Sequence, residues 1–374
     1  MLWPCDMGNA RGRMRLEDWA VVRQVLPEGW QQAARRLGAF GRVRQVKSPE
    51  VLLRVLLVHL AEGCSLQETA TRVRELGWVD RLTPQAVALR LQSSEQWLRW
   101  MAEKLWTDRA PQPTWQKYRV RAVDATVVRE SGRTGSQWRV HYALGLRDLQ
   151  CDFFELTDVH GGETLRRVPV QRGDLLLGDR VYGAPPGIAQ VTRSGGAVLV
   201  RVSLQILPLF DRKGQRMKLR DRLKRLRIGD VCEMPAYVHG PRNERIAGRL
   251  IALRRSRHST RAVLKRLKRK HQKNMTTPSK IALETARYLL LWTSVPAAHF
   301  RAPELLEMYR LRWQIELAFK RVKSIMGLGQ LPKHADPSSR AWLHGKLVVA
   351  LLIEKLIHAA ESFSPWGYDF EVPA

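Results

Sequence analysis

The spacing of apolar residues changes abruptly near residue 110, and this change divides the chain. From about Ser48 to Trp106 the apolar positions recur at helical intervals. After a linker marked by Pro111 and Pro113, apolar and polar residues alternate, which is the period of a half-buried strand. The 374-residue chain is therefore expected to hold a helical N-terminal domain, residues 1–110, followed by a mixed α/β region.

The α/β region opens with three sequential strands, which predict an antiparallel meander. These strands are expected over 120–128, 138–146 and 151–157. A short helix over 162–168 and a compact apolar strand over 174–177 follow them. Strand, strand, strand, helix, strand is the opening order of a ribonuclease-H-like fold, so we expect an α/β fold of that class.

Two short helices in the N-terminal region have clear start signals. Ser65 and Glu68 form a capping box, and Thr83 with Pro84 starts the next helix. Joined by a turn at Gly77, the pair resembles a helix-turn-helix that would contact DNA. A helical bundle with a solvated basic face is an equally well supported interpretation.

The charge balance points to a polyanionic partner. The chain has 64 Lys and Arg residues against 35 Asp and Glu residues, a net charge of +29. Such an excess repels itself unless a polyanion neutralises it, so nucleic acid is the first partner to consider.

Two cationic runs carry much of this excess within a β-rich insertion, residues 201–284. Nine Lys and Arg residues accompany one acid over 212–227, and thirteen accompany no acid over 245–280. The runs predict contacts with DNA phosphates, although a solvated cationic surface would have the same composition. The residues expected to bind are Lys265, Arg266, Lys268, Arg269 and Lys270.

Missing motifs argue against several other classes of protein. The four cysteines are scattered without a C-x-x-C spacing, which disfavours zinc modules and disulfide scaffolds. No G-x-x-x-x-G-K-[ST] loop is present, so no nucleotide cofactor is expected. The N-terminus lacks a secretory signal, and the best apolar run, Leu347–Ile353, is too short to cross a bilayer. We therefore expect a cytoplasmic protein without a membrane partner.

Two aspartates in this basic chain directly follow apolar strands. Asp124 follows residues 120–123, and Asp179 follows residues 175–178. A central sheet would present both carboxylates at one of its edges, where they could act together. The alternative is that each aspartate caps a turn, which is a common role at strand ends.

A third acid lies on a helix expected over 303–325. Tyr309, Arg312, Glu316 and Lys323 are spaced 3, 4 and 7 residues apart, which places them on one stripe about 60° wide. An apolar stripe runs beside them, so the helix can pack on a sheet and hold the polar stripe at its rim. The alternative is a set of ordinary helical ion pairs, each worth about 0.2–0.5 kcal/mol.

These residues resemble a family. Tyr309-x2-Arg312-x3-Glu316-x6-Lys323 matches the signature of the DDE transposases of the bacterial insertion-sequence-four family, over residues 118–361. Asp179-Arg180-x-Tyr182 looks like that family's second aspartate motif, and Val123-Asp124-Ala125-Thr126 looks like its first. The resemblance implies a retroviral-integrase-like catalytic core in two parts, residues 111–200 and 285–362, with a tail over 363–374.

The resemblance also implies a function. A transposase of this family binds the terminal inverted repeats of an insertion sequence on double-stranded DNA, cuts the ends and joins them to target DNA, which predicts a homodimer on bacterial nucleoid DNA. Asp124, Asp179 and Glu316 would be catalytic and would hold two Mg²⁺ or Mn²⁺ ions, which prefer carboxylate oxygens. DNA contacts are expected from Arg180, Tyr182, Tyr309, Arg312 and Lys323.

Some assignments stay open at the level of sequence. By the same resemblance, Tyr288 or Trp292 would stack a base flipped out near the cut end, with core packing as the alternative for each. The apolar stripe over 338–361 fits a core helix better than a dimer helix. Two other functions remain: a metal-dependent nuclease or resolvase without strand transfer, and a catalytically inactive DNA-binding protein derived from a transposase.

Overall fold

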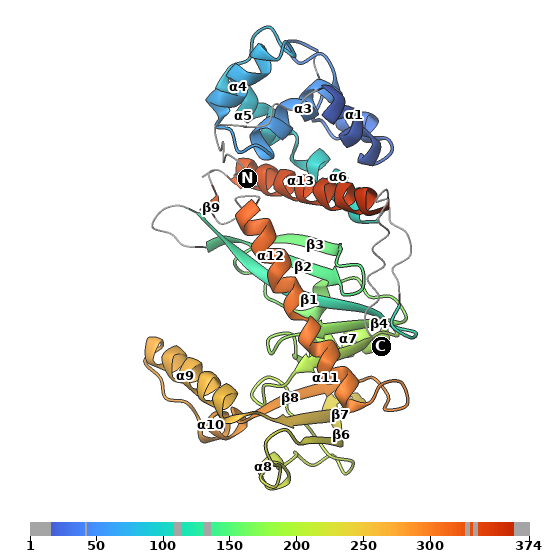
Figure 1. Cartoon of the computed structure of the whole chain (residues 1–374), viewed down its shortest axis with the longest axis vertical. Coiled ribbons are helices and arrows are strands. Elements are labelled where there is room, and N and C mark those ends of the chain that lie inside the picture. The colour runs from blue at the N-terminus through green and yellow to red at the C-terminus, as the bar shows by residue number, and fades with distance from the viewer. Residues whose placement is uncertain are drawn as a thin grey trace, which may run out of the picture. The chain divides into compact units, whose positions relative to one another are not determined.

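The computed structural model describes residues 16–41, 43–107, 114–130, 136–325, 330–331 and 336–362. These residues form two compact units, whose elements are labelled in Figure 1. The first unit consists of helices α1–α6 and α13, and the second holds every described strand together with α7–α12. None of the helices described is both long and apolar enough to cross a membrane.

The helical unit confirms the start signals read from the sequence. The Ser65 hydroxyl accepts the N–H of Glu68 while the Glu68 carboxylate accepts the N–H of Ser65, and Thr83 caps the helix that Pro84 opens. The helices of this unit are α1 (Leu16–Val25), α2 (Trp30–Arg36), α3 (Pro49–Leu60), α4 (Leu66–Glu75), α5 (Pro84–Ser93), α6 (Glu95–Thr107) and α13 (Asp336–Ser362).

Helix α13 packs in the helical unit against α3, α5 and α6. Its Leu343, Leu347 and Leu351 are buried, so the apolar stripe is core, as expected. The sequence-based assignment groups residues 285–362 with the catalytic core, whereas α13 packs within the helical unit. Hydrophobic spacing shows which face of a helix is buried but not which element covers that face.

A mixed nine-stranded sheet forms the second unit, in the order β3-β2-β1-β4-β5-β8-β7-β6, with β9 paired to β1. The first three strands form the predicted antiparallel meander, β4 and β5 run parallel to β1, and β8, β7 and β6 continue antiparallel. The strands are β1 (Arg119–Glu130), β2 (Ser136–Gly145), β3 (Cys151–Asp158), β4 (Asp174–Gly178), β5 (Ala197–Arg201), β6 (Val231–His239), β7 (Arg245–Arg254), β8 (Tyr288–Thr293) and β9 (Gln330–Leu331).

The helices of the second unit depart from the sequence prediction at two places. The helix expected over 303–325 is two helices that meet at Arg312. The second cationic run, expected to be β-rich, includes a 17-residue helix, α9, without a buried residue. The helices are α7 (Pro185–Arg193), α8 (Leu219–Leu223), α9 (Arg257–Lys273), α10 (Lys280–Thr285), α11 (Ala302–Leu311) and α12 (Trp313–Ile325), and a 3₁₀ turn spans Leu165–Arg167.

The insertion over 201–284 extends the central sheet instead of folding apart from it. Its β6–β7 hairpin joins the sheet through β7, which pairs with β8 along six residues from Arg249 to Arg254. Helix α9 begins after β7, where Ser256 caps it by accepting the N–H of Ser259. The absence of acids along α9 obscured its helical spacing of Val263, Leu264 and Leu267.

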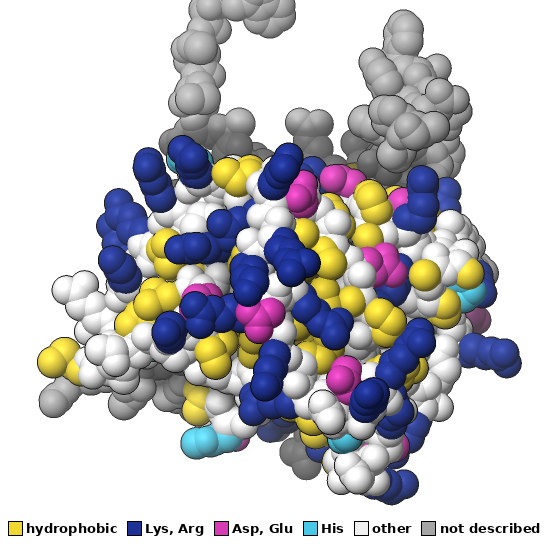
Figure 2. All heavy atoms as spheres, turned by 90° about the horizontal axis from the view of Figure 1, so that it is seen from below, with side chains coloured by type: hydrophobic (Ala, Val, Ile, Leu, Met, Phe, Trp, Pro, Cys, Tyr) yellow, Lys and Arg dark blue, Asp and Glu magenta, His cyan; other side chains and the backbone are white. Residues whose placement is uncertain are grey.

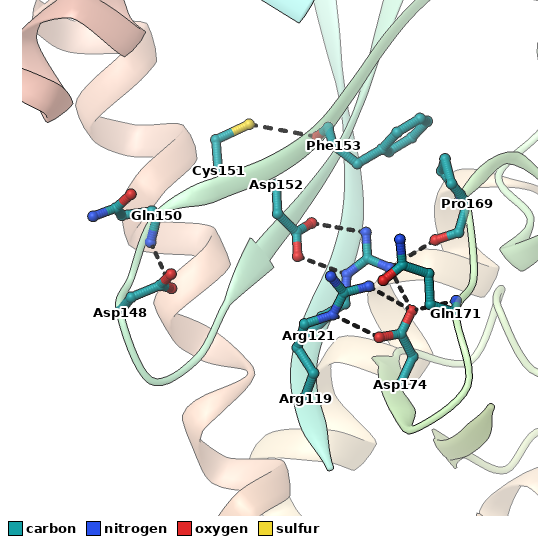
Figure 3. Close-up of polar contacts among 10 residues, drawn as sticks. All are labelled: Arg119, Arg121, Asp148, Gln150, Cys151, Asp152, Phe153, Pro169, Gln171 and Asp174. Atoms are coloured by element: carbon teal, nitrogen blue, oxygen red, sulfur yellow. Dashed lines mark hydrogen bonds and ion pairs between the residues drawn. The ribbon is translucent and has the colours of Figure 1, made fainter. Parts of the chain in front are cut away.

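A buried ion network aligns β1 with β4 (Figure 3). Arg119 donates to both carboxylate oxygens of Asp174 at 2.6 and 2.8 Å, and Arg121 donates to Asp174 at 3.0 Å. Arg121 also forms two hydrogen bonds with Asp152 on β3 at 2.6 and 2.8 Å. Arg121 and Asp174 are at most 2% exposed. The network therefore ties three strands together at the end from which β1 and β4 start.

Candidate active site

Asp124, inside β1, and Asp179, directly after β4, lie at the same level on neighbouring strands. Ala122 of β1 pairs with Leu177 of the parallel strand β4, and each aspartate lies two residues beyond its member of that pair. Asp124 Oδ1 accepts the N–H of Ala125 at 2.9 Å, and Asp179 Oδ1 accepts the N–H of Val181 at 2.9 Å. The register of the sheet thus brings together the two acids that the sequence singled out.

The surroundings of Asp124 favour its neutral form. The pKa of this carboxyl is raised from 3.8 to about 6, mainly by burial; the Ala125 N–H and the charge of Arg312 lower it, and the negative charges of Asp179 and Glu163 raise it. Glu163, whose pKa is also raised by burial, was not identified from the sequence. Its side chain lies 3.7 Å from Arg139 Nε. Three acids therefore influence one another in this part of the sheet.

Tyr182 lies among these acids, but it is buried. Its side chain is 2% exposed, and its hydroxyl pKa is raised by burial and then by the charges of Asp124, Glu163 and Asp179. A β-carbon at Gly178 would stand 2.6 Å from the Tyr182 Cβ, so this position needs glycine. The predicted DNA contact by Tyr182 is therefore corrected to a packing role beside the acids.

The junction of α11 and α12 carries the third acid. Phe319 of α12 packs on Tyr142 of β2 with ring centroids 5.5 Å apart, which sets α12 against the meander (Figure 1). Glu316 then projects at the rim, with 54% of its side chain exposed. Arg312 Nη2 donates to Glu316 Oε1 at 2.7 Å, and Arg312 Nη1 lies 3.8 Å from Asp124 Oδ2.

The other two members of the predicted polar stripe are Tyr309, which contacts Arg312, and Lys323. The Arg312 guanidinium lies 5.8 Å from the centroid of the Tyr309 ring, so these two residues share the site. Burial raises the pKa of the Tyr309 hydroxyl, whereas the charges of Arg312 and Arg201 lower it. Lys323 belongs to the last turn of α12, and its side chain lies outside the described residues.

Beside Asp179, the predicted Arg180 is joined by two arginines that the sequence did not single out, Arg201 and Arg255. Arg180 follows Asp179, Arg201 ends β5 and Arg255 follows β7. Burial, then the charges of Arg180 and Arg255, lower the pKa of Arg201 to about 10. In the part of the chain that the structure describes, none of the three forms an ion pair, and Arg255 Nε is buried without a hydrogen-bond partner. Such a cluster is an anion site.

Both aromatic candidates for base stacking, Tyr288 and Trp292, already make contacts within the protein. Trp292 is fully buried, its indole N–H donates to the carbonyl of Ala236 at 3.0 Å, and it presses so close to Gly248 that a β-carbon there would clash. The prediction of a DNA contact by Trp292 is therefore wrong for this structure, because its ring is core. Tyr288 is half-buried, donates to the carbonyl of Leu223 at 2.9 Å and has Arg254 over its ring at 4.7 Å.

The predicted cationic residues of the insertion are all exposed on α9. Lys265, Arg266, Lys268, Arg269 and Lys270 occupy its second half, and no acid lies on the helix. Lysine and arginine side chains are also spread over the face seen from below in Figure 2, with fewer acids between them.

The donor set fits a hard divalent cation. Asp124 and Asp179 offer carboxylate oxygens side by side, and the raised pKa of Asp124 shows that this position would gain from a nearby positive charge. Among the described residues, no three Asp, Glu, His or Cys side chains are grouped closely enough to hold a metal. Glu316 is instead held by Arg312.

Comparison with known proteins identifies this arrangement. Residues 115–352 match the family described as the transposase DDE domain. The chain belongs to the DDE transposases. This transposase is 29% identical over 357 residues to the putative transposase InsL for insertion sequence element IS186A and to the transposase for insertion sequence element IS421, both of Escherichia coli. The alignments cover 93% of this chain and 96% of each relative.

The fold of the transposase is similar to that of a solved transposase. It matches the piggyBac transposase in a synaptic complex with hairpin DNA, with a TM-score of 0.51, 8% identity, and coverage of 92% of this chain and 73% of that chain. As a DDE transposase related to insertion-sequence enzymes, the protein cleaves DNA and transfers strands, and it depends on divalent metal. Its partner is DNA.

Proposed function

We propose that this transposase is a member of the insertion-sequence-four family that cuts an insertion sequence out at its terminal inverted repeats and pastes it into target DNA. Asp124, Asp179 and Glu316 are the proposed catalytic acids. The observation that carries this assignment is the equal level of Asp124 and Asp179 on adjacent parallel strands, with Glu316 joined to Asp124 through Arg312. The clustering of Tyr309, Arg312 and Glu316 supports the family signature.

We assign the second unit to the ribonuclease-H-like class. The strand order β3-β2-β1-β4-β5, with β2 antiparallel and β4 and β5 parallel to β1, supports a retroviral-integrase-like core. Residues 201–284 then form an insertion between β5 and β8. This assignment gives each acid a fixed position, because β1, β4 and α12 are all core elements.

The proposed cofactor is a pair of Mg²⁺ or Mn²⁺ ions. When bound, such ions stabilise negative charge on the attacking and leaving oxygens of a phosphodiester. Asp124 and Asp179 would hold them from the sheet, and Glu316 would complete the set from α12. Burial, together with the charges of Asp179 and Glu163, raises the pKa of Asp124, so a cation bound beside this carboxyl would stabilise its ionised form.

The arginines would hold the DNA end in the site. Arg180, Arg201 and Arg255 lie near Asp179 without ion-pair partners among the described residues, and guanidinium groups match the geometry of phosphate oxygens. Tyr309, between Arg312 and Arg201, can donate a hydrogen bond to the same backbone. These residues position the phosphodiester and neutralise its charge while the acids hold the metal.

The rest of the DNA path is proposed to follow the cationic insertion. Exposed Lys and Arg side chains of α9 would contact phosphates and give no sequence preference. Cut-and-paste movement joins two ends to one target, and each chain supplies one acidic triad, so we propose a homodimer that acts on bacterial nucleoid DNA in the cytoplasm.

Isosteric amides test the catalytic assignment. Asp124→Asn, Asp179→Asn and Glu316→Gln should each reduce Mg²⁺-dependent cleavage of the element's end at least about 100-fold while leaving DNA binding in place. Glu307→Gln is the matched control, because Glu307 is an exposed acid on α11 that pairs with Arg310. Wild-type cleavage by the Glu316→Gln protein would overturn the assignment.

A further inference from the structure

Arg312 bridges two of the three proposed metal ligands. Its Nη2 donates to Glu316 Oε1 at 2.7 Å, and its Nη1 lies 3.8 Å from Asp124 Oδ2. Only 15% of the Arg312 side chain is exposed. A cationic group of the protein itself therefore already engages carboxylates from β1 and from α12.

This bridge is incompatible with full use of the same oxygens by a metal ion. A divalent cation and a guanidinium both require the carboxylate oxygens of Asp124 and Glu316, and their positive charges repel each other at short range. Arg312 therefore competes with a metal ion for these two carboxylates, and metal binding through Glu316 Oε1 requires that Arg312 release that oxygen.

The local structure allows Arg312 to move. It occupies the single-residue break between α11 and α12, where its N–H donates to Tyr309 and its carbonyl accepts the N–H of Ile315, both at 3.2 Å. These short-range bonds replace the regular helical pattern, and such irregular turns inside helices are frequent at functional hinges. Its Nε is buried and has no hydrogen-bond partner, so the present position leaves one donor unused.

A DNA phosphate that approaches the arginine cluster would also come close to Arg312. Tyr309 feels the charges of both Arg312 and Arg201, and Arg201 in turn feels those of Arg180 and Arg255. An entering DNA phosphate is attracted to this group and offers Arg312 oxygens that no metal requires.

We infer that Arg312 is a latch that couples metal binding to DNA binding. In the DNA-free protein it competes with the metal for Asp124 and Glu316, and a DNA phosphate releases the latch by binding the guanidinium. Each ligand then raises the affinity for the other, since linkage is reciprocal. The protein would then bind its metal ions tightly only when a DNA end is bound as well. This inference rests on the proposed metal-binding role of the acids.

Metal binding without DNA tests the latch directly. Mn²⁺ is titrated into the metal-free protein, and free Mn²⁺ is measured from its electron paramagnetic resonance signal. Arg312→Gln should bind Mn²⁺ about fivefold or more tightly than the wild type, the lower end of usual coupling between sites. Arg312→Lys, which keeps the charge but cannot span two carboxylates, should fall between them. Equal affinity of the wild type and Arg312→Gln would overturn the latch.

Arg310→Gln is the matched control. Arg310 is an exposed cation on α11 that pairs with Glu307. Removing it should strengthen Mn²⁺ binding no more than about twofold, because salt screens an exposed charge. A gain equal to that of Arg312→Gln would show that the effect is general electrostatics and would overturn the latch.

The coupling itself is measured by adding a blunt duplex of the sequence that flanks the element's reading frame. The wild type should gain Mn²⁺ affinity with this DNA, whereas Arg312→Gln should gain little, because its latch is already absent. Equal gains would overturn the coupling. Asp124→Asn separates the two hypotheses: if it binds Mn²⁺ like the wild type, the proposed metal site is wrong, whatever Arg312 does.

Discussion

The surroundings of Asp124 destabilise its ionised form, yet it is the ionised form that would bind a metal. Its carboxylate is partly buried beside Asp179 and Glu163, an arrangement that stabilises the neutral acid. A metal ion would reverse that preference, since it stabilises the ionised ligand. Protons and metal therefore compete for this carboxylate at a pH that can be reached in an experiment.

The pH dependence of metal binding follows from the raised pKa of Asp124. Because this pKa is about 6, the carboxyl becomes neutral as the pH falls through that value, and metal affinity should then decrease. Below about pH 5 the decrease should approach tenfold per pH unit, the slope of one competing proton. Mn²⁺ titrations from acid to neutral pH measure this curve. Glu163→Gln removes a charge that raises the pKa, so it should move the inflection to lower pH; an unmoved inflection would contradict the assignment.

At the residue scale, the acids are easier to single out from the sequence than the cations. Asp124 and Asp179 stand out because each follows an apolar strand in a basic chain, and Glu316 belongs to a recognisable spacing. Arg201 and Arg255 are only two among many arginines until the sheet places them near Arg180. Trp292 and Tyr288 look alike in sequence, and only the packing of Trp292 on Gly248 separates them.

Among the elements, β1 and β4 determine the geometry of the site, and their alignment rests on the ion network in Figure 3. Asp174→Asn should remove the buried carboxylate that both Arg119 and Arg121 bind. The expected loss of unfolding free energy is about 3–5 kcal/mol, measured by urea denaturation. Asp221→Asn is the control, since that acid lies in an exposed pair with Lys224 and should not change the midpoint measurably.

Helix α9 allows a test of the DNA path. Changing Lys265, Arg266, Lys268, Arg269 and Lys270 to Gln keeps helix propensity and removes five charges. If these residues contact phosphates, the slope of log K against log salt should flatten by up to about 0.9 for each lost contact. Circular dichroism checks that the helix remains. An unchanged slope would mean that α9 is a solvated face and that DNA lies elsewhere.

The elements themselves were predictable where local signals decide. The caps at Ser65 and Thr83 and the apolar run of β4 lie at the expected places. The break at Arg312 was not predictable, because a one-residue irregularity hardly disturbs the apolar spacing on either side. The packing of α13 in the helical unit was not predictable either, because apolar spacing does not show which element covers the buried face.

At the scale of the whole molecule, two copies are expected to share the reaction. A single chain that cut one end at a time would lose the other end by diffusion, so pairing should precede cutting. Mixing Asp124→Asn with the five-Gln α9 protein tests this: each alone should be defective, and restored cleavage would show that one copy binds the end that the other cuts. Full cleavage of an isolated end by a demonstrated monomer would exclude the dimer.

The continuous sheet also has a mechanical consequence. Strands β5, β8, β7 and β6 share one ladder of hydrogen bonds, and α9 is attached directly to the end of β7. The insertion therefore cannot swing as a tethered module, because any tilt would have to break or shear that ladder. If DNA binds α9 as proposed, its load would be carried across the strands toward Arg201 at the end of β5. The insertion would then act as a rigid extension of the sheet and hold the DNA at a fixed angle to Asp124 and Asp179.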